Sequence, residues 1–161
     1  MSRPKLLYFI TEDWYFCSHR LPLALAAQDA GYDVAVVTHV NKHGEAIRRA
    51  GIRLISFNLS RRGMNLVSEV AMLARLIALY QIEKPDLVHH VAMKPVLYGS
   101  LAARLSGVPR VVNALAGLGY VFTSEQPTAK LLRPVISSAF RGLLNGLSSQ
   151  LILQNQDDRA M

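Results

Sequence analysis

The chain has 161 residues, 51% hydrophobic and 18% charged, a balance that excludes a disordered chain and fits one domain with a sizeable core. Its formal net charge of +7 favours anionic partners. Nucleic acid is the weakest of these, because the sequence has no zinc-finger spacing, aromatic RNA-binding signature or long basic run.

The predicted elements alternate between strands and helices. The first half predicts a strand at 5–11, a helix at 18–30, a strand at 33–38, a short helix at 43–51, a strand at 52–57 and a long helix at 65–83. The second half predicts a strand at 86–91, a helix at 95–106, a strand at 110–115, a helix from about 129 to 147 and a strand at 150–155. These nearly continuous apolar strands predict a parallel sheet covered on both faces. Right-handed crossovers favour a doubly wound, Rossmann-like α/β sheet in the order 3-2-1-4-5-6.

The long helix at 65–83 carries a regular apolar pattern. Leu66, Val70, Leu73, Ile77 and Tyr80 fall on one face, and we expect that face to pack on the sheet.

The compartment is indicated by what the sequence lacks. Cys17 is the single cysteine, so there is no internal disulfide framework, and a reducing compartment is favoured. The apolar run at the N-terminus is too short for a signal peptide, and no stretch approaches the roughly 20 apolar residues of a membrane span. We expect a cytoplasmic protein, soluble or peripheral on the inner face of the plasma membrane.

A ligand site is expected beyond the carboxyl ends of the strands, where the strand order reverses. Here that point lies between the first and fourth strands, so the loops TEDWYFCSHR and HHVAMKP border it, with AGLGY nearby. The first loop has Trp14 and Tyr15 where a dinucleotide-binding fingerprint would need glycines, which argues against NAD or FAD.

The first loop offers several candidate side chains. Glu12 and Asp13 could accept hydrogen bonds from sugar hydroxyls or act as a base, or they could cap the strand end and stay solvated. His19 and Arg20 could contact an anion or an acceptor hydroxyl, although His19 could equally bond to the helix end. We expect Cys17 to be a small buried filler.

The fourth loop begins with two histidines. His89 and His90 point to opposite faces of a strand, so at most one can face the site; we favour His90 and expect the other to be a hydrogen-bonded packing residue. No metal is expected, because Cys or carboxylate partners at ligand spacing are missing. Lys94 would place an ammonium near a helix N-terminus, where it could bind a phosphate or diphosphate or remain solvated.

Two further segments carry glycines or basic residues. Gly117 and Gly119 allow close ligand approach, but no Lys-Ser/Thr follows them as in a phosphate loop. Arg61 and Arg62 form a basic tip that suits a membrane surface or an anionic acceptor. The helix at about 129–147 either lies against lipid or is a core helix with a solvated basic face, formed by Lys130, Arg133 and Arg141.

Three segments in this order carry a resemblance to a known family: EDWYFCSHRLPLALAAQDAGYDV, SRRGMN and PDLVHHVAMKPVLYGSLAARLSGVPRVVNALAGLGYVFTSE. They resemble the N-terminal domain of family-four glycosyltransferases, and more narrowly bacterial enzymes that build lipid-linked oligosaccharides for polysaccharide or glycoprotein assembly. The resemblance implies a GT-B enzyme with two Rossmann-like domains facing a cleft. The N-terminal domain, here 1–161, holds the acceptor, and the C-terminal domain, absent from this chain, holds the nucleotide sugar.

The activity implied is retaining transfer of a sugar from a nucleotide sugar to a prenyl-diphosphate-linked saccharide, with no metal or other cofactor. Such transfer can use the donor phosphate, so the resemblance names no catalytic base. The chain alone is expected to be inactive. The candidate acceptor and cleft residues are Glu12, Trp14, His19, Arg20, Arg62, His90, Lys94, Tyr98, Gly117, Gly119 and Tyr120. Two alternatives stay open: a binding module or partner subunit without its own catalysis, and half of a GT-B sugar-nucleotide epimerase.

Overall fold

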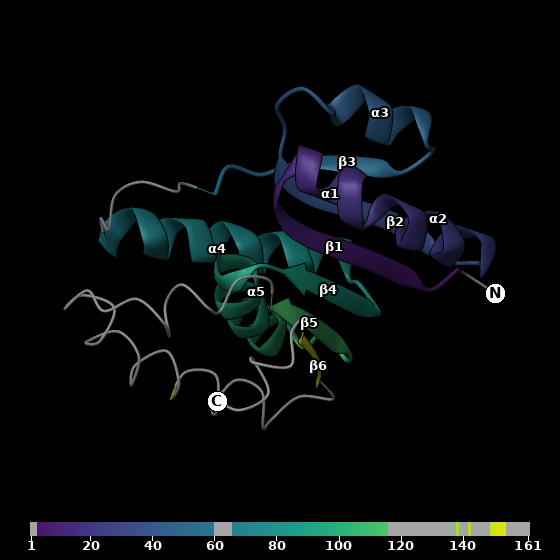
Figure 1. Cartoon of the computed structure of the whole chain (residues 1–161). Helices are drawn as coiled ribbons and strands as arrows, with labels where there is room; N and C mark the ends of the chain where they lie inside the picture. The colour runs from purple at the N-terminus through teal and green to yellow at the C-terminus, as the bar shows by residue number, and fades with distance from the viewer. Residues whose placement is uncertain (1–2, 60–65, 116–137, 139–141, 143–148, 154–161) are drawn as a thin grey trace.

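A parallel sheet of six strands runs through the molecule in the order β3-β2-β1-β4-β5-β6, as predicted. The strands are β1 (Lys5–Glu12), β2 (Asp33–His39), β3 (Arg53–Ser56), β4 (Leu87–Val91), β5 (Val111–Leu115) and β6 (Ser149–Leu153). All neighbouring pairs are parallel. The computed structural model describes residues 3–59, 66–115, 138, 142 and 149–153 (Figure 1).

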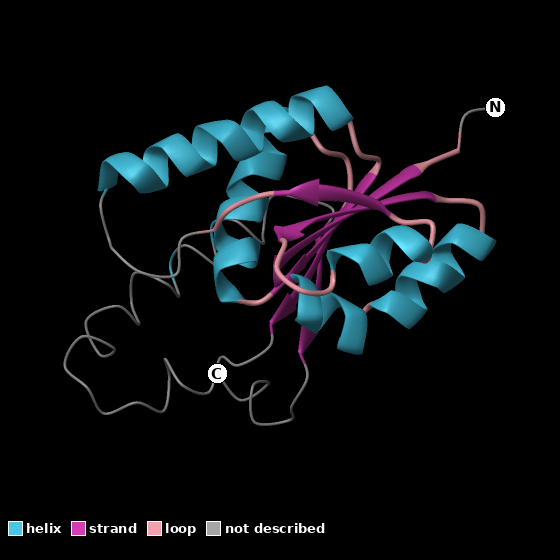
Figure 2. Ribbon diagram, turned by 90° about the horizontal axis from the view of Figure 1, so that it is seen from above, coloured by secondary structure: helices cyan, strands magenta, loops and turns pink. Residues whose placement is uncertain are grey.

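Helices cover both faces of the sheet (Figure 2). On one face lie α1 (Asp13–His19), α2 (Leu21–Asp29) and α3 (Gly44–Arg49), and on the other lie α4 (Leu66–Glu83) and α5 (Met93–Ser106). This division confirms the doubly wound, Rossmann-like class. Of the helix predicted at about 129–147, only residues 138 and 142 are described, and both are helical.

The structure corrects the prediction for the segment after β1. What was expected to be a loop is α1, and the helix expected at 18–30 begins only at Leu21, because Arg20 has non-helical backbone angles and Pro22 lies in the first turn of α2. The aromatic residues of α1 are weak helix formers, so its pattern did not stand out. Phe16 stabilises it by packing, fully buried, on the sheet.

Apolar side chains fill the space on each side of the sheet, because successive strand residues point to opposite faces. The layer under α4 and α5 contains Leu7, Phe9, Val88 and Val111 from the strands and Leu76, Tyr80, Ala102 and Ala103 from the helices. The other layer contains Leu6, Tyr8, Val34, Val36 and Val91 with Phe16, Ala24 and Ile47. Each large aliphatic or aromatic side chain buried in this way contributes about 1.5–3 kcal/mol to folding.

The predicted core face of α4 is partly wrong. Tyr80 is buried, and Leu73 and Ile77 pack partly buried against the core, as expected. Val70, however, is 59% exposed, and the residue at the centre of the core face is the fully buried Leu76. The side chain of Leu66 lies outside the described part.

The connection from β4 to α5 is strained at Ala92. Its backbone angles, φ 83° and ψ 161°, belong to a region that residues with a Cβ avoid. The surroundings hold it there: its N–H donates to the carbonyl of Ala114 at 3.1 Å, and its carbonyl accepts from Val96 at 3.0 Å to start α5. The sequence gives no indication of this positive φ, because alanine is common in ordinary backbone conformations.

Replacing Ala92 by glycine tests this strain. Because glycine adopts positive φ without a steric penalty, Ala92→Gly is expected to raise the free energy of unfolding by about 1 kcal/mol. The matched control is Ala78→Gly on the exposed side of α4, which should lower it by about 1 kcal/mol. Urea denaturation measures both, and a loss of stability in Ala92→Gly would show that Ala92 is not strained.

Candidate functional site at the carboxyl edge of the sheet

The site expected from the sequence lies at the edge where the parallel strands end. There α1 starts at the residue after β1, and α5 starts two residues after β4 (Figure 1). The start of α4 lies at this edge too, since α4 follows β3 and lines a cavity together with residues after β3 and at the start of α5. The candidate side chains therefore divide between the two faces of the sheet.

On the α1 side, exposed rings form a small ledge. Trp14 is 47% exposed and meets the Tyr15 ring edge to face at a centroid distance of 5.6 Å. The exposed His19 stacks on the Tyr15 ring at a centroid distance of 4.3 Å, and its Nδ1 lies 2.6 Å from Ser18 Oγ. Glu12 is half-buried at the N-cap of α1 without a capping hydrogen bond from its side chain. The ledge offers aromatic faces and an imidazole to a ligand.

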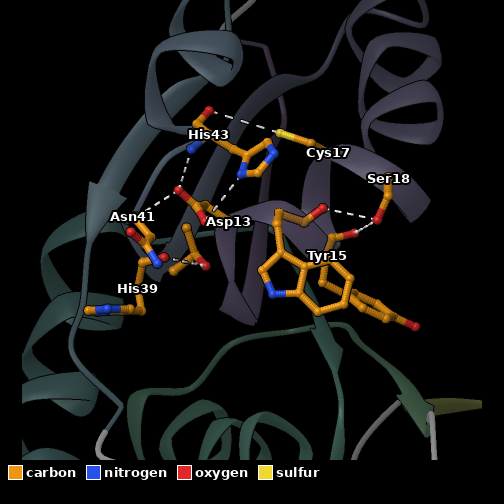
Figure 3. A network of polar contacts seen from close by, with 9 residues as sticks. Asp13, Tyr15, Cys17, Ser18, His39, Asn41 and His43 are labelled. Atoms are coloured by element: carbon orange, nitrogen blue, oxygen red, sulfur yellow. Dashed lines mark hydrogen bonds and ion pairs between the residues drawn. The ribbon is translucent and has the colours of Figure 1, made fainter.

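Asp13 does not stay solvated, as one alternative proposed. It is fully buried, and its Oδ2 accepts the backbone N–H groups of Asn41 at 2.7 Å and His43 at 2.8 Å (Figure 3). Burial acts to raise the pKa of Asp13, but these hydrogen bonds outweigh it and hold the pKa below its usual range. Asp13 is therefore an ionised carboxylate that ties the loop after β2 to α1, and it is poorly placed to act as a base.

Cys17 is half-buried rather than a buried filler, with its Sγ 4.0 Å from the carbonyl oxygen of His43 (Figure 3). Burial and then the negative charge of Asp13 raise the pKa of Cys17, so the side chain stays a thiol at neutral pH.

Arg20 and His89 lie on the same face of the sheet as α1. His89 is 6% exposed and stacks on Tyr8 at 5.0 Å, and burial followed by the charge of Arg20 lowers its pKa to about 4. Arg20 is half-buried between α1 and α2. Neither Arg20 Nε nor His89 Nε2 has a hydrogen-bond partner within the described residues.

His90 lies in the core on the opposite face and not in the crevice. It is fully buried, its Nδ1 lies 2.8 Å from Asn113 Oδ1, and its Nε2 lies 3.0 Å from the Tyr80 hydroxyl. Because Asn113 Oδ1 only accepts, Nδ1 carries the proton and Tyr80 donates to Nε2. Burial lowers the pKa of His90 to about 4, so the ring is neutral. This corrects the expectation that His90 faces the site: it has the hydrogen-bonded packing role that was expected of the other histidine.

Lys94 is held in an ion pair rather than simply solvated. Its Nζ lies 3.1 Å from Glu69 Oε1 on α4 and 5.9 Å from the centroid of the half-buried Tyr98 ring. The Tyr98 hydroxyl and then Lys94 lower the pKa of Glu69, while burial and then Glu69 raise the pKa of Tyr98 to about 12. Sequence reasoning missed Glu69, because only the fold brings the first turns of α4 and α5 together.

A cavity of about 270 Å³ opens beside this ion pair. It is lined by Asn58, Ser68, Glu69, Ala71, Met72, Arg75 and Lys94. The Arg75 guanidinium lies 5.4 Å above the Phe57 ring, so two cations and one carboxylate surround the cavity. Such a lining suits a polar ligand that carries both hydroxyls and negative charge.

A larger hollow of about 450 Å³ lies at the opposite edge of the sheet. It is lined by the last turns of α4 and α5 and the segments after them, including Tyr80, Lys84, Asp86, Gly107 and Pro109. Ligands of open parallel sheets bind at the carboxyl ends of the strands, so the smaller cavity is the better candidate.

Several candidates lie outside the described residues: Arg61, Arg62, Gly117, Gly119, Tyr120, Lys130, Arg133 and Arg141. Over the part of the chain that is described, no group of three metal-ligating side chains occurs, and no helix is long and apolar enough to cross a membrane.

The fold is a doubly wound, Rossmann-like domain with a polar cavity at the carboxyl edge of its sheet. The family model described as glycosyl transferase 4-like matches residues 5–155, and the chain therefore belongs to this family.

Two curated proteins similar to this chain are named as glycosyltransferases. The chain is 25% identical over 142 residues to the N,N'-diacetylbacillosaminyl-diphospho-undecaprenol alpha-1,3-N-acetylgalactosaminyltransferase of Campylobacter jejuni, covering 86% of this chain and 37% of that protein. It is 35% identical over 65 residues to the UDP-Gal:alpha-D-GlcNAc-diphosphoundecaprenol alpha-1,3-galactosyltransferase of Escherichia coli. This match covers 40% of this chain and 17% of that protein. The chain thus spans less than two fifths of the length of either relative.

Solved structures show the same fold. Acinetobacter baumannii MurG superposes with a TM-score of 0.57 at 17% identity, covering 81% of this chain and 39% of that one. The UDP-GlcNAc 2-epimerase of Neisseria meningitidis superposes with a TM-score of 0.57 at 19% identity, covering 92% of this chain and 46% of that one. At these identities the likeness concerns the fold alone.

The packing of His90 predicts the effect of a single methyl group. A Cβ on Gly99 of α5 would lie 2.5 Å from the His90 ring, so Gly99→Ala must displace the ring or the helix. We expect the free energy of unfolding to fall by about 1–3 kcal/mol. Gly142→Ala is the control, because a Cβ there meets nothing within 4 Å. Equal stabilities of the two variants in urea would contradict the close approach of α5 to His90.

The two histidines also predict how stability depends on pH. Their folded pKa values of about 4 lie below the unfolded value near 6.5, so the unfolded chain binds more protons between these limits. Stability is therefore full above pH 6.5 and falls as pH drops towards 4, by up to about 3 kcal/mol for each histidine.

Urea denaturation from about pH 7 to about pH 4.5 measures this loss. His90→Gln should reduce the slope of the unfolding free energy against pH by an amount that corresponds to about one bound proton. His89→Gln provides the same test from the other face of the sheet. A stability that is level across this range would contradict neutral, buried histidines.

Proposed function

We propose that this chain is the acceptor-binding domain of a retaining glycosyltransferase. The complete enzyme would move a sugar from a nucleotide-sugar donor to a saccharide carried on a prenyl diphosphate. The observation that carries the proposal is the family match over residues 5–155, together with two relatives whose names each specify a diphospho-undecaprenol-linked sugar.

The cavity at the carboxyl edge supports an acceptor with these chemical features. Lys94 and Arg75 would attract the negative charge of a diphosphate, and the Glu69 carboxylate would accept hydrogen bonds from sugar hydroxyls. The exposed Trp14 and His19 offer an aromatic and polar surface on the other side of the sheet. The proposed reaction uses no metal or other cofactor beyond the nucleotide sugar.

The donor would bind to a second domain. The chain corresponds to 37% of the Campylobacter jejuni relative, which leaves room for a nucleotide-sugar domain in the complete protein. We propose that the two domains face each other across the carboxyl edge, and that the protein associates peripherally with an anionic membrane where its lipid-linked acceptor resides.

The second candidate is a sugar-nucleotide epimerase. The likeness to the UDP-GlcNAc 2-epimerase of Neisseria meningitidis favours it, although that likeness concerns the fold. Incubating the full-length protein with UDP-GlcNAc and no acceptor separates the two activities. Formation of the epimer would establish the epimerase and exclude the transferase proposal.

Lys94 is the most direct test of the acceptor site. In the full-length enzyme, Lys94→Met is expected to lower kcat/KM for a diphosphate-linked acceptor by about 10- to 100-fold, because it removes a charge that faces the diphosphate. Arg49→Met is the control, since this 79% exposed side chain forms its ion pair with Glu45 on α3.

A structural role for Lys94 would give a different pattern. If Lys94 only held Glu69 in place, Glu69→Gln would lower kcat/KM as much as Lys94→Met does. The effect of Lys94→Met would then not depend on whether the acceptor carries a diphosphate. Kinetics of Lys94→Met that match the unaltered enzyme would remove Lys94 from the acceptor site.

A further inference from the structure

The face of the sheet that α1 and α2 cover holds two buried nitrogen atoms without a hydrogen-bond partner in the described part of the chain. They are Arg20 Nε and His89 Nε2. Because His89 is only 6% exposed, bulk water does not replace the missing partner of its ring. A buried polar atom left unpaired costs about 1–3 kcal/mol, so each of these nitrogens calls for a group that bonds to it.

Arg20 is also a cation without a counter-ion. Of the arginines that the structure describes, Arg20 is half-buried and the others are exposed, and no described carboxylate forms an ion pair with it. A half-buried charge of this kind is unfavourable unless an opposite charge reaches it. The guanidinium therefore calls for an anion.

The charge of Arg20 acts on two rings that stack on each other at 5.0 Å, those of Tyr8 and His89. Burial and then Arg20 lower the pKa of His89 to about 4. Burial raises the pKa of Tyr8 to about 12, and Arg20 opposes that rise. The guanidinium thus lies close enough to His89 for both residues to bond to one ligand.

The backbone holds Arg20 at a fixed junction between two helices. Its N–H donates to the carbonyl of Phe16 in α1 at 2.9 Å, and its carbonyl accepts from Ala24 in α2 at 2.9 Å. Phe16 is fully buried and meets the Tyr8 ring edge to face at 5.6 Å. A ligand at Arg20 would therefore not have to order a loop first.

A row of side chains across the sheet leads from His89 towards solvent. The residues in register along this row are Tyr8 on β1, His89 on β4, Val112 on β5 and Gln150 on β6. Tyr8 is buried, Val112 is half-buried and Gln150 is exposed. Exposure thus rises with distance from α1 and α2, which pack on β1 and β2, and a ligand can approach from the side of β6.

We propose that Arg20 and His89 bind an oxyanion, the phosphate or carboxylate group of a small ligand. The guanidinium would donate from its Nε and Nη atoms, whose forked geometry suits either group. The neutral imidazole would donate from Nε2, since it can carry its one proton there. It would add a hydrogen bond without adding a second positive charge, so the site matches a single anionic group.

This site is separate from the candidate acceptor cavity. Lys94 and Glu69 line that cavity from α5 and α4, which lie on the other face of the sheet. The two places would therefore bind different groups, and the inference does not rest on the proposed function.

Titration of the chain with inorganic phosphate, and separately with acetate, tests the proposal. The signal is the Cε1 proton of the His89 ring in the NMR spectrum, identified by its absence from His89→Gln. We expect a saturable shift of this signal. The pKa of His89 should also rise from about 4, because a bound anion favours the protonated ring. The anion that binds more tightly shows whether the site takes a phosphate or a carboxylate group.

Arg20→Gln should weaken binding of the preferred anion by about tenfold or more, because it removes a charged donor. Arg20→Lys keeps the charge but loses the fork, so it should bind with intermediate affinity, and it serves if Arg20→Gln does not fold. The matched control is Arg49→Gln on α3, which follows β2 and precedes the edge strand β3. The Arg49 side chain is 79% exposed, and its loss changes the net charge equally, so binding should stay within about twofold.

Two results would overturn the proposal. One is a His89 signal that neither anion shifts in a saturable manner. The other is equal weakening by Arg20→Gln and Arg49→Gln, because attraction by the net charge alone would then explain the binding. Neither anion takes part in sugar transfer, so failure of this titration leaves the proposed function standing. A loss of the proposed function in the Lys94→Met kinetics would likewise leave the anion site standing.

Discussion

The pairing of β1 with β4 is the constraint on which the rest of the structure depends. These strands run side by side from Leu6 and Leu87 to Ile10 and Val91, at the point where the strand order reverses. On one face Tyr8 stacks on His89 at 5.0 Å, and on the other Phe9 meets His90 edge to face at 6.2 Å. The pair thus joins the two halves of the sheet through aromatic contacts on both faces.

This reversal decides where chemistry can occur. The helices between β1 and β3 cover one face of the sheet, and the helices that follow β3 and β4 cover the opposite face, so the carboxyl ends of the central strands stay open. The buried network of His90, Tyr80 and Asn113 fixes α4 against the sheet beneath this edge. The first turns of α4 and α5 can then place Glu69 and Lys94 within 3.1 Å of each other.

Much of the fold could be predicted from the sequence, because its strands are short apolar runs separated by helical patterns and closed by glycines. The strand order followed from right-handed crossovers together with the usual order of a doubly wound sheet. The misses were local. Nothing marked α1, whose helix depends on Phe16 packing on the sheet, and the period of α4 did not show that Leu76 rather than Val70 faces inward.

The site was less predictable than the fold, because its contacts join residues distant in sequence. Strand alternation showed that His89 and His90 face opposite ways, but not that α5 would approach His90 so closely at Gly99 that the ring is enclosed. Lys94 could be placed at the edge from its position before Pro95. Its partner Glu69 could not, because 25 residues separate the two and only the crossover from β3 to β4 brings them together.

The helix α4 takes part in both the core and the candidate site, and its three sides therefore differ in character. Its inner side must be apolar to cover the sheet, its first turn must be polar to pair with Lys94, and its outward side carries three exposed aliphatic side chains. Packing explains the first demand and the ion pair explains the second. Neither explains why Val67, Val70 and Ile82 are exposed.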